Sequence, residues 1–252
     1  MAPALEKDIQ AALSGVVIPY LDQDPLDAGL PVEVDRAEAA LVLRLKLGFF
    51  LGDRAEELAG QLKLALQQET GLQDVQVDIQ TRIVSHAVQG TLAPIEGVKN
   101  IIAVASGKGG VGKSSVAVNL ALALAQDGAQ VGILDADIYG PSQPRMLGKA
   151  GENPETLDGK TFEPLEAHGL QFMSVGCLVD EDQPTVWRGP MATTALTQIF
   201  MQTNWRDLDY LIVDMPPGTG DIQLTLSQKV PVSGAIIVTT PQDIALIDAY
   251  KG

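Results

Sequence analysis

The sequence predicts an α/β protein whose main domain is a parallel sheet with helices on both faces, preceded by a small α+β domain. From Asn100 onward, short continuous apolar runs alternate with helical patterns. Such runs are typical of strands buried on both faces, and their alternation with helices indicates a parallel sheet. Before residue 80, the strand-like segments instead alternate apolar and polar residues, as half-buried strands do. The 252 residues are enough for about two domains.

The first domain, residues 1–80, begins with a predicted helix and a predicted strand. Apolar residues recur at intervals of three and four over residues 5–13, which predicts the helix. The strand is LVLRLKL at 41–47, with four leucines on one face and Arg44 and Lys46 on the other. One face of this strand is therefore expected to contact the core.

A second helix of this domain is predicted to begin after Asp53, with Glu56 placed three residues later as in a capping box. Its apolar residues repeat with a helical period, and Gly71 stands where a left-handed residue closes a helix. Residues 75–79 alternate again and predict a second strand.

The domain boundary is predicted at residues 81–99, which have no clear period and contain Gly90, Pro94 and Gly97. The second domain is predicted to span residues 100–252. Its predicted strands are IIAVA at 101–105, VGIL at 131–134, LQFMSV at 170–175, YLIVD at 210–214 and GAIIVTT at 234–240.

Residues 107–114, GKGGVGKS, fit the phosphate-binding pattern G-x-x-x-x-G-K-[ST] and lie between a predicted strand and a predicted helix. Glycines let such a loop fold around an anion, and the following helix turns its positive end toward it. The pattern identifies a P-loop, in which we expect Lys113 to reach the outer phosphates of a nucleotide and Ser114 to bind Mg²⁺. The predicted nucleotide-binding residues are Gly107, Lys108, Gly109, Gly110, Val111, Gly112, Lys113, Ser114 and Ser115.

Acidic residues follow two of the predicted strands. One strand is followed by Asp135, Ala136 and Asp137, and another ends in Asp214. Carboxylates at the carboxyl ends of parallel strands face the crevice where ligands bind. We therefore expect Asp214 to hold Mg²⁺ through water and Asp137 to orient an attacking water molecule. Helix capping or solvation in a loop is the alternative role for both side chains.

The charge and the cysteine content exclude several classes of function. The formal net charge of −15 is spread over both domains, which argues against nucleic acid and anionic membranes as partners. A single cysteine excludes an intramolecular disulfide and is consistent with a reducing compartment. The start of the chain differs from a secretory leader, and no apolar stretch is long enough to span a membrane. These observations predict a cytoplasmic protein.

Several segments resemble a known family. Lys108 is similar to the extra lysine in the deviant Walker A loop shared by ParA- and MinD-type ATPases and the nitrogenase iron protein. Within that class, DADIYGPSQP at 135–144, WRGPM at 187–191 and WRDLDYLIVDMPPGTGD at 205–221 resemble the Mrp/ApbC family of iron-sulfur cluster carrier ATPases. The resemblance covers nearly all of residues 97–252.

The resemblance implies a homodimer that sandwiches two ATP molecules, in which Lys108 of one subunit touches the phosphates bound by the other. A second cation at the γ-phosphate would stabilise developing charge as an arginine finger does. The resemblance further implies that Gly218 and Gly220, which follow two prolines, belong to a loop that senses the γ-phosphate. Asn119 is shared with the family, and its hydrogen bond has either a functional or a structural role.

The resemblance also implies that ATP and Mg²⁺ time the loading or release of a [4Fe–4S] cluster to apo iron-sulfur proteins. The family holds its cluster on a C-x-x-C motif contributed by two subunits, and these 252 residues contain no such motif. An amphipathic segment follows the strand at 234–240 where a parallel sheet would need a further strand, so we expect a truncated chain. The cluster ligands are therefore not present in this chain.

Two other functions stay open at this point. One is a MinD- or ParA-like positioning ATPase, from which the acidic surface and the segment DADIYGPS differ. The other is an interaction module that binds ATP without turnover, which a turnover assay would distinguish.

Some conspicuous residues are expected to have structural roles. Cys177 lies in an apolar run and is expected to be a buried free thiol. His86 and His168 lack a Cys or His at metal-ligand spacing and are expected to be surface or structural residues. Trp187 and Arg188 are expected in a loop between a strand and a helix, where Arg188 would contact nucleotide or the partner subunit if the role were functional.

Overall fold

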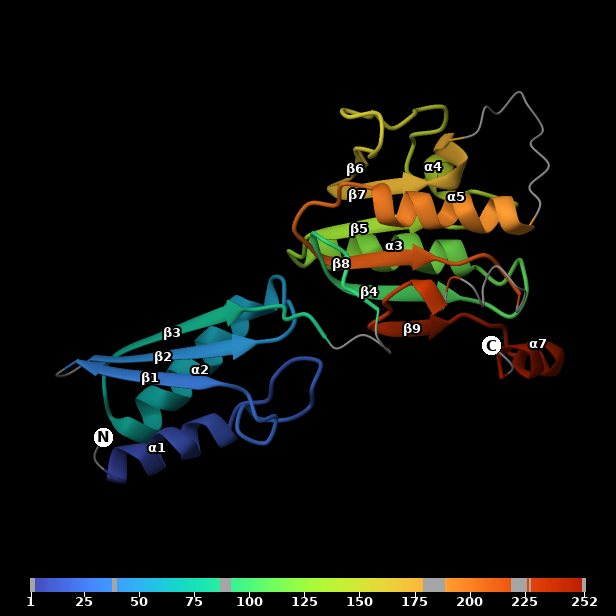
Figure 1. Ribbon diagram of the computed structural model, residues 1–252. Coiled ribbons are helices and arrows are strands. Elements are labelled where there is room, and N and C mark those ends of the chain that lie inside the picture. The colour runs from blue at the N-terminus through green and yellow to red at the C-terminus, as the bar shows by residue number, and fades with distance from the viewer. Residues whose placement is uncertain are drawn as a thin grey trace. The chain divides into compact units, whose positions relative to one another are not determined.

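The computed structural model describes residues 3–37, 40–86, 92–178, 189–218, 226 and 228–250. The chain divides into two compact units, residues 1–84 and residues 85–252 (Figure 1).

The first unit is a three-stranded sheet with two helices. The strand order is β1-β2-β3, with β1 antiparallel to β2 and β2 parallel to β3. The elements are α1 (Pro3–Ser14), β1 (Val32–Ala37), β2 (Ala40–Leu47), α2 (Arg54–Thr70) and β3 (Asp74–Thr81). The predicted helices and strands of this unit are thus confirmed, whereas β1 was not predicted.

The core of the first unit is built from leucines that recur every second residue in β2 and every fourth residue in α2. Alternate residues of β2 are buried, and α2 buries leucines one turn apart. The opposite face of β2 is polar, where Arg44 pairs with Asp35 and Lys46 with Glu33 on β1. The fully buried leucines are Leu41, Leu43, Leu45, Leu47, Leu58, Leu62 and Leu66.

The two ends of α2 differ from each other in how well they were predicted. Gly71 has φ 71° and donates its N–H to the carbonyl of Gln67, which confirms the left-handed helix end. The capping box is wrong, because Asp53 has helical φ and ψ angles and makes no side-chain capping hydrogen bond. A capping residue needs an extended backbone to aim its carboxylate at the first free N–H groups, and Asp53 does not have one.

The second unit is a six-stranded sheet of order β6-β7-β5-β8-β4-β9. All neighbours pair in parallel except β6, which is antiparallel to β7 at one edge. The elements are β4 (Val98–Ala105), α3 (Lys113–Gln126), β5 (Val131–Asp135), α4 (Gln143–Met146), β6 (Leu165–Ala167), β7 (Leu170–Ser174), the 3₁₀ turn η1 (Val175–Leu178), α5 (Gly189–Gln202), β8 (Leu208–Asp214), β9 (Gly234–Ile237) and α7 (Asp243–Ala249).

Helices cover both faces of the larger sheet, as predicted (Figure 1). Leu211 and Val213 of β8 pack in one apolar cluster with Leu196 and Ile199 of α5. Ile212 lies between them in the sequence, is fully buried and points to the opposite face, which α3 covers. The sheet is therefore buried on both sides at its centre.

Two edge strands depart from the prediction. β6 was not predicted, because three residues are too few for a periodic signal. The last predicted strand is shorter than expected, since β9 covers only Gly234–Ile237, and its residues are exposed rather than buried on both faces. Within the described residues β9 pairs with β4 alone, so it is an edge strand of the described sheet. In the described part of the chain, none of the helices is both long and apolar enough to cross the hydrocarbon of a bilayer.

Candidate functional site

The phosphate loop lies between the carboxyl end of β4 and the first turn of α3. Gly110 and Gly112 have φ angles of 79° and 91°, a region that side chains other than glycine rarely adopt. A Cβ atom on Gly107 would lie 2.8 Å from the backbone carbonyl carbon of Asp248 in α7. Glycine is thus required at Gly110 and Gly112 by the backbone angle, and at Gly107 by close packing.

Lys113 and Asp214 meet at the base of this loop. Lys113 is 6% exposed, Asp214 is fully buried, and the Lys113 ammonium forms an ion pair with Oδ1 of Asp214. The same ammonium donates to the hydroxyl of Ser114, 3.2 Å away. The last residues of β8 and the first residues of α3 are therefore joined by a buried charge pair.

Asp135 ends β5 directly beside Asp214, its register partner in β8. Burial raises the pKa of Asp135 to about 7; the hydrogen bond from the Gln143 N–H lowers this pKa, and the negative charge of Asp214 raises it. The carboxylate of Asp135 accepts hydrogen bonds from the N–H groups of Asp137 (3.1 Å), Ser142 (2.9 Å) and Gln143 (3.0 Å) and from the hydroxyl of Ser174 (3.3 Å).

Asp137 lies two residues beyond β5 and is half-buried. Its backbone contacts Asp135, and its Oδ1 atom is buried without a hydrogen-bond partner in the described part of the chain. The structure thus brings Asp135, Asp137, Asp214 and Lys113 to the same carboxyl edge of the sheet.

Gln143 is a site residue that the sequence analysis missed. It is fully buried, and its Nε2 donates to the backbone carbonyl of Ser114 (3.1 Å) and to Oδ2 of Asp214 (2.9 Å). The segment DADIYGPSQP contains this residue, but a single glutamine at the start of a four-residue helix carries no motif of its own.

The remaining predicted loop residues lie toward solvent. Lys108, Gly109, Gly110, Gly112 and Ser115 are exposed, and Val111 is half-buried. The backbone carbonyl of Lys108 accepts a hydrogen bond from the hydroxyl of Ser106, 3.0 Å away. Asn119 donates to the carbonyl of Ser115 within its own helix, so its hydrogen bond in this structure is structural.

The described residues after β8 reach the residue that precedes the phosphate loop. Gly218, with φ 99°, donates its N–H to the carbonyl of Ser106, 2.9 Å away. Gly220, Trp187 and Arg188 lie outside the described residues, so the predictions for them stay predictions.

The donor atoms at this edge suit a magnesium ion that arrives with a nucleotide. Oδ1 of Asp137, Oγ of Ser142 and Oε1 of Gln143 are buried oxygens with no partner among the described residues. Mg²⁺ prefers oxygen ligands and usually takes one or two from the protein and others from phosphates and water. Within the described ranges, no three His, Cys, Asp or Glu side chains cluster as a metal site made of protein alone.

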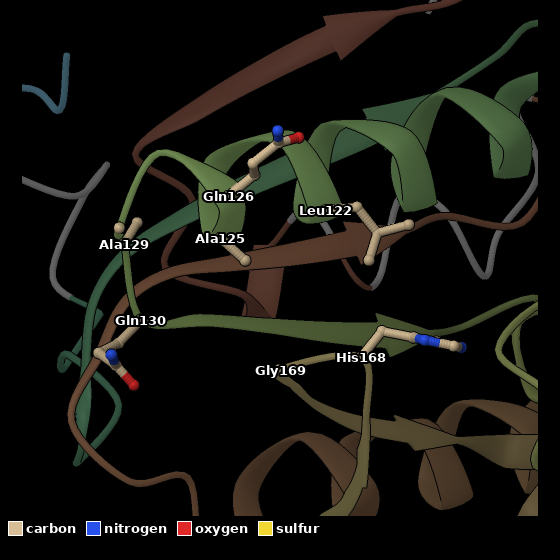
Figure 2. Close-up of a pocket in the computed structure, with 8 residues that line it drawn as sticks. Leu122, Ala125, Gln126, Ala129, Gln130, His168 and Gly169 are labelled. Carbon is tan, nitrogen blue, oxygen red and sulfur yellow. The ribbon is translucent and has the colours of Figure 1, made fainter. Parts of the chain in front are cut away.

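A cavity of about 440 Å³ lies at the opposite, amino-terminal edge of the sheet. Figure 2 shows Leu122 and Ala125 of α3, Ala129 and Gln130 of the turn before β5, and His168 of the β6–β7 turn around it. Because β5 and β7 both begin here, this cavity is separated from the phosphate loop by the length of the strands.

The residues expected to be structural behave as predicted where they are described. Cys177 is a buried free thiol, and burial raises its pKa to about 11. His86 and His168 are exposed; the ring and the backbone N–H of His86 both contact Oδ1 of Asn100.

Comparisons with known proteins identify relatives over both units. The family model of the NUBPL iron-transfer P-loop NTPases of the ParA class matches residues 97–252. The chain is 49% identical over 247 residues to an iron-sulfur cluster carrier protein of Haemophilus influenzae, covering 98% of this chain and 67% of the relative. It is 58% identical over 161 residues to the mouse iron-sulfur cluster transfer protein NUBPL, covering 63% of this chain and 50% of the relative.

A solved structure is similar as well. It is a nucleotide-binding protein from Archaeoglobus fulgidus in complex with ADP, with a TM-score of 0.52 and 36% identity over 62% of this chain and 61% of that chain. The chain spans one half to two thirds of the length of these relatives. With a family model over more than half of its residues, the chain belongs to the iron-sulfur cluster carrier family of P-loop NTPases.

Proposed function

We propose that this chain binds Mg²⁺ and ATP at its phosphate loop, and that the complete protein hydrolyses ATP as it loads or transfers iron-sulfur clusters. The observation that carries the proposal is the buried ion pair of Lys113 with Asp214, held between the P-loop and the end of β8. A buried lysine paired with one carboxylate is costly for stability alone, which favours a functional reason for its position.

Nucleotide binding would exchange the partner of Lys113. Phosphate oxygens carry more negative charge than one carboxylate, so the ammonium turns from Asp214 to the outer phosphates. The backbone N–H groups of the glycine loop and the amino end of α3 bind the same anion. Asp214 then loses its cation and is available, together with the hydroxyl of Ser114, to hold Mg²⁺.

Magnesium supplies positive charge that neutralises the phosphates as the terminal bond breaks. Asp137, whose buried Oδ1 has no hydrogen-bond partner among the described residues, is proposed to accept a hydrogen bond from the attacking water and so orient it toward the γ-phosphate. Lys113 remains on the leaving side, where it balances the charge that develops on the β-phosphate.

A homodimer would complete the site. Lys108 is exposed on the loop, so its ammonium is free to reach out of its own subunit. We propose that it touches the phosphates bound by a second copy, where an additional cation stabilises the transition state.

The cluster is cargo in this proposal, and its ligands lie outside this chain. A [4Fe–4S] cluster usually needs four thiolates. The chain has one cysteine, Cys177, whose buried thiol has a pKa of about 11, so even two copies offer two poor ligands. The relatives named as iron-sulfur cluster carriers favour this cargo over the role of a positioning ATPase.

The test is made on the full-length protein. We expect Mg²⁺-dependent release of phosphate from ATP, and transfer of a reconstituted cluster to an apo iron-sulfur protein under anaerobic conditions. The 252-residue chain alone, treated with iron and sulfide, is expected to lose its absorbance and iron on desalting. Nucleotide binding without turnover would support the non-catalytic alternative, and a stoichiometric cluster on the short chain would contradict the assignment of the ligands.

A further inference from the structure

Gln143 joins three elements of the phosphate site, two through its side chain and one through its backbone. Its amide contacts Ser114 in α3 and Asp214 at the end of β8, and its backbone N–H donates to Asp135 at the end of β5. It is fully buried, so these hydrogen bonds do not compete with solvent.

The orientation of this amide is fixed by its neighbours. Both atoms near Nε2, the Ser114 carbonyl oxygen and Oδ2 of Asp214, are acceptors. Turning the amide over would place its oxygen against two other oxygens, so the nitrogen must point toward them. Oε1 therefore points the other way, and it has no hydrogen-bond partner among the described residues.

The two oxygens of Asp214 have different partners. Oδ1 pairs with Lys113, whereas Oδ2 accepts from Gln143 at 2.9 Å. If Lys113 turns to a phosphate, the Oδ1 contact is lost and the Oδ2 contact stays. A buried carboxylate with no partner is costly and free to rotate, and the amide of Gln143 limits both effects.

We propose that Gln143 is the positioning residue that holds the Asp214 carboxylate in place for Mg²⁺ when Lys113 moves to the nucleotide. Gln143 does this through Nε2, and its Oε1, which has no partner in the described part of the chain, would accept a hydrogen bond from a water molecule that the ion carries. This role rests on the proposed nucleotide function. It means that α4, through Gln143, would help to orient the Asp214 carboxylate toward Mg²⁺.

The test compares full-length wild-type protein with Gln143→Met, which keeps the length of the side chain and removes its hydrogen bonds. Binding of a fluorescent ADP analogue is measured without Mg²⁺ and across a Mg²⁺ titration. We expect the affinity without Mg²⁺ to stay within about threefold, and the Mg²⁺ concentration at half-effect to rise about tenfold, as for other residues that orient metal ligands.

Gln171→Met is the control. Gln171 likewise makes two side-chain hydrogen bonds, both with the backbone of Arg206 at 2.8 and 3.0 Å, but it is half-buried and lies in β7, away from the phosphate loop. A structural role for Gln143 would lower the melting temperature as Gln171→Met does and leave the Mg²⁺ titration unchanged, which would overturn the proposal.

A second variant covers the case in which Gln143→Met does not fold. Gln143→Glu keeps the shape of the side chain but places a third carboxylate beside Asp135 and Asp214. We expect the Mg²⁺ concentration at half-effect to rise more than in Gln143→Met, while the nucleotide still binds. An unchanged titration in this variant also overturns the proposal. If wild-type protein binds no nucleotide at all, the proposed function fails, and this outcome is distinct from a wild-type response that Gln143 does not alter.

Discussion

The two units of the chain bury different kinds of side chain. In the first unit, the buried side chains that the structure describes are all apolar, and its charged residues pair on the outer face of β2. In the second unit, Lys113, Asp135, Gln143 and Asp214 are buried together at one edge of the sheet. The first core needs only apolar side chains of suitable volume at the period of a strand or a helix. The second unit also buries polar groups, at a cost in stability, where a ligand would be bound.

The comparison leads to different expectations for substitutions in the two units. Changes at the polar edge should alter chemistry more than folding, and changes in the leucine core should alter folding and leave chemistry intact.

Lys113→Ala is expected to reduce ATP hydrolysis by the full-length protein by more than about 10³-fold, because the phosphates lose their main point charge in both binding and reaction. Initial rates of phosphate release measure this effect. The Asp214 carboxylate also loses its buried cation, so a thermal melt is recorded beside the assay. Turnover within threefold of wild type would remove Lys113 from the site.

Lys108→Ala is expected to lower hydrolysis by about 10²-fold while nucleotide affinity of the monomer stays within a few-fold, since only the partner's phosphates lose a contact. Turnover and equilibrium binding are measured on the same preparation. Lys149→Ala serves as control, since Lys149 pairs with Glu152 at 2.9 Å outside the loop. An equal loss of affinity and turnover would place Lys108 in its own subunit's site.

Alkylation of Cys177 by iodoacetamide at pH 8 is expected to be about 100-fold slower in the folded chain than in urea, since the thiolate is the reactive form. Burial raises the pKa from 9.0 to about 11, so the rate should climb with pH until about pH 11. Mass spectrometry follows the adduct, and Cys177→Ser is the blank. A rate that levels off below pH 9 would show that the thiol is not buried as described.

Leu43→Ala is expected to destabilise the first unit by about 2–5 kcal/mol, because it leaves a cavity where a fully buried leucine side chain packs. Urea unfolding measures the change, and ATP hydrolysis should stay at the wild-type rate. Leu64→Ala, at a position 61% exposed on α2, is the control and should change stability by less than about 0.5 kcal/mol. A loss of hydrolysis in the folded Leu43→Ala protein would contradict the expectation that changes in the leucine core leave the chemistry intact.

The surface pair of Lys46 with Glu33 is expected to contribute less than about 1 kcal/mol, because side chains exposed by 30% and 52% are well screened. A double-mutant cycle with alanine at both positions measures the coupling, which should fall further in high salt. A coupling above 2 kcal/mol would show that charges matter to the first unit as much as to the second.

Local patterns account for what could be predicted from the sequence. The loop at 107–114 and the alternation of β2 are patterns within one contiguous stretch of sequence, so the sequence predicts the position of both correctly. Asp135 and Asp214 were expected at one edge because parallel strands end together, and they are register partners. The family was recognised from three contiguous segments and is confirmed by the comparisons.

What could not be predicted depends on contacts between distant residues. Gln143 matters because it meets Ser114 and Asp214, which are far from it in the sequence. β6 is too short for a period, and β9 has the sequence of a buried strand but lies at an edge of the described sheet. The capping box predicted at Asp53 is wrong because the residues fit the pattern but the backbone angles of Asp53 do not. The roles of the site residues stay predictions.

The contact between Gly107 and Asp248 has a consequence for the newly made chain. The loop that would receive the nucleotide is packed against α7, which is synthesised about 140 residues later. At about 5–20 residues per second, α7 is synthesised roughly 7–28 s after the glycine loop. During that interval the ribosome-bound chain has its glycine loop but not the helix that packs against it. The packing of Gly107 against α7 can therefore form only after α7 has left the exit tunnel.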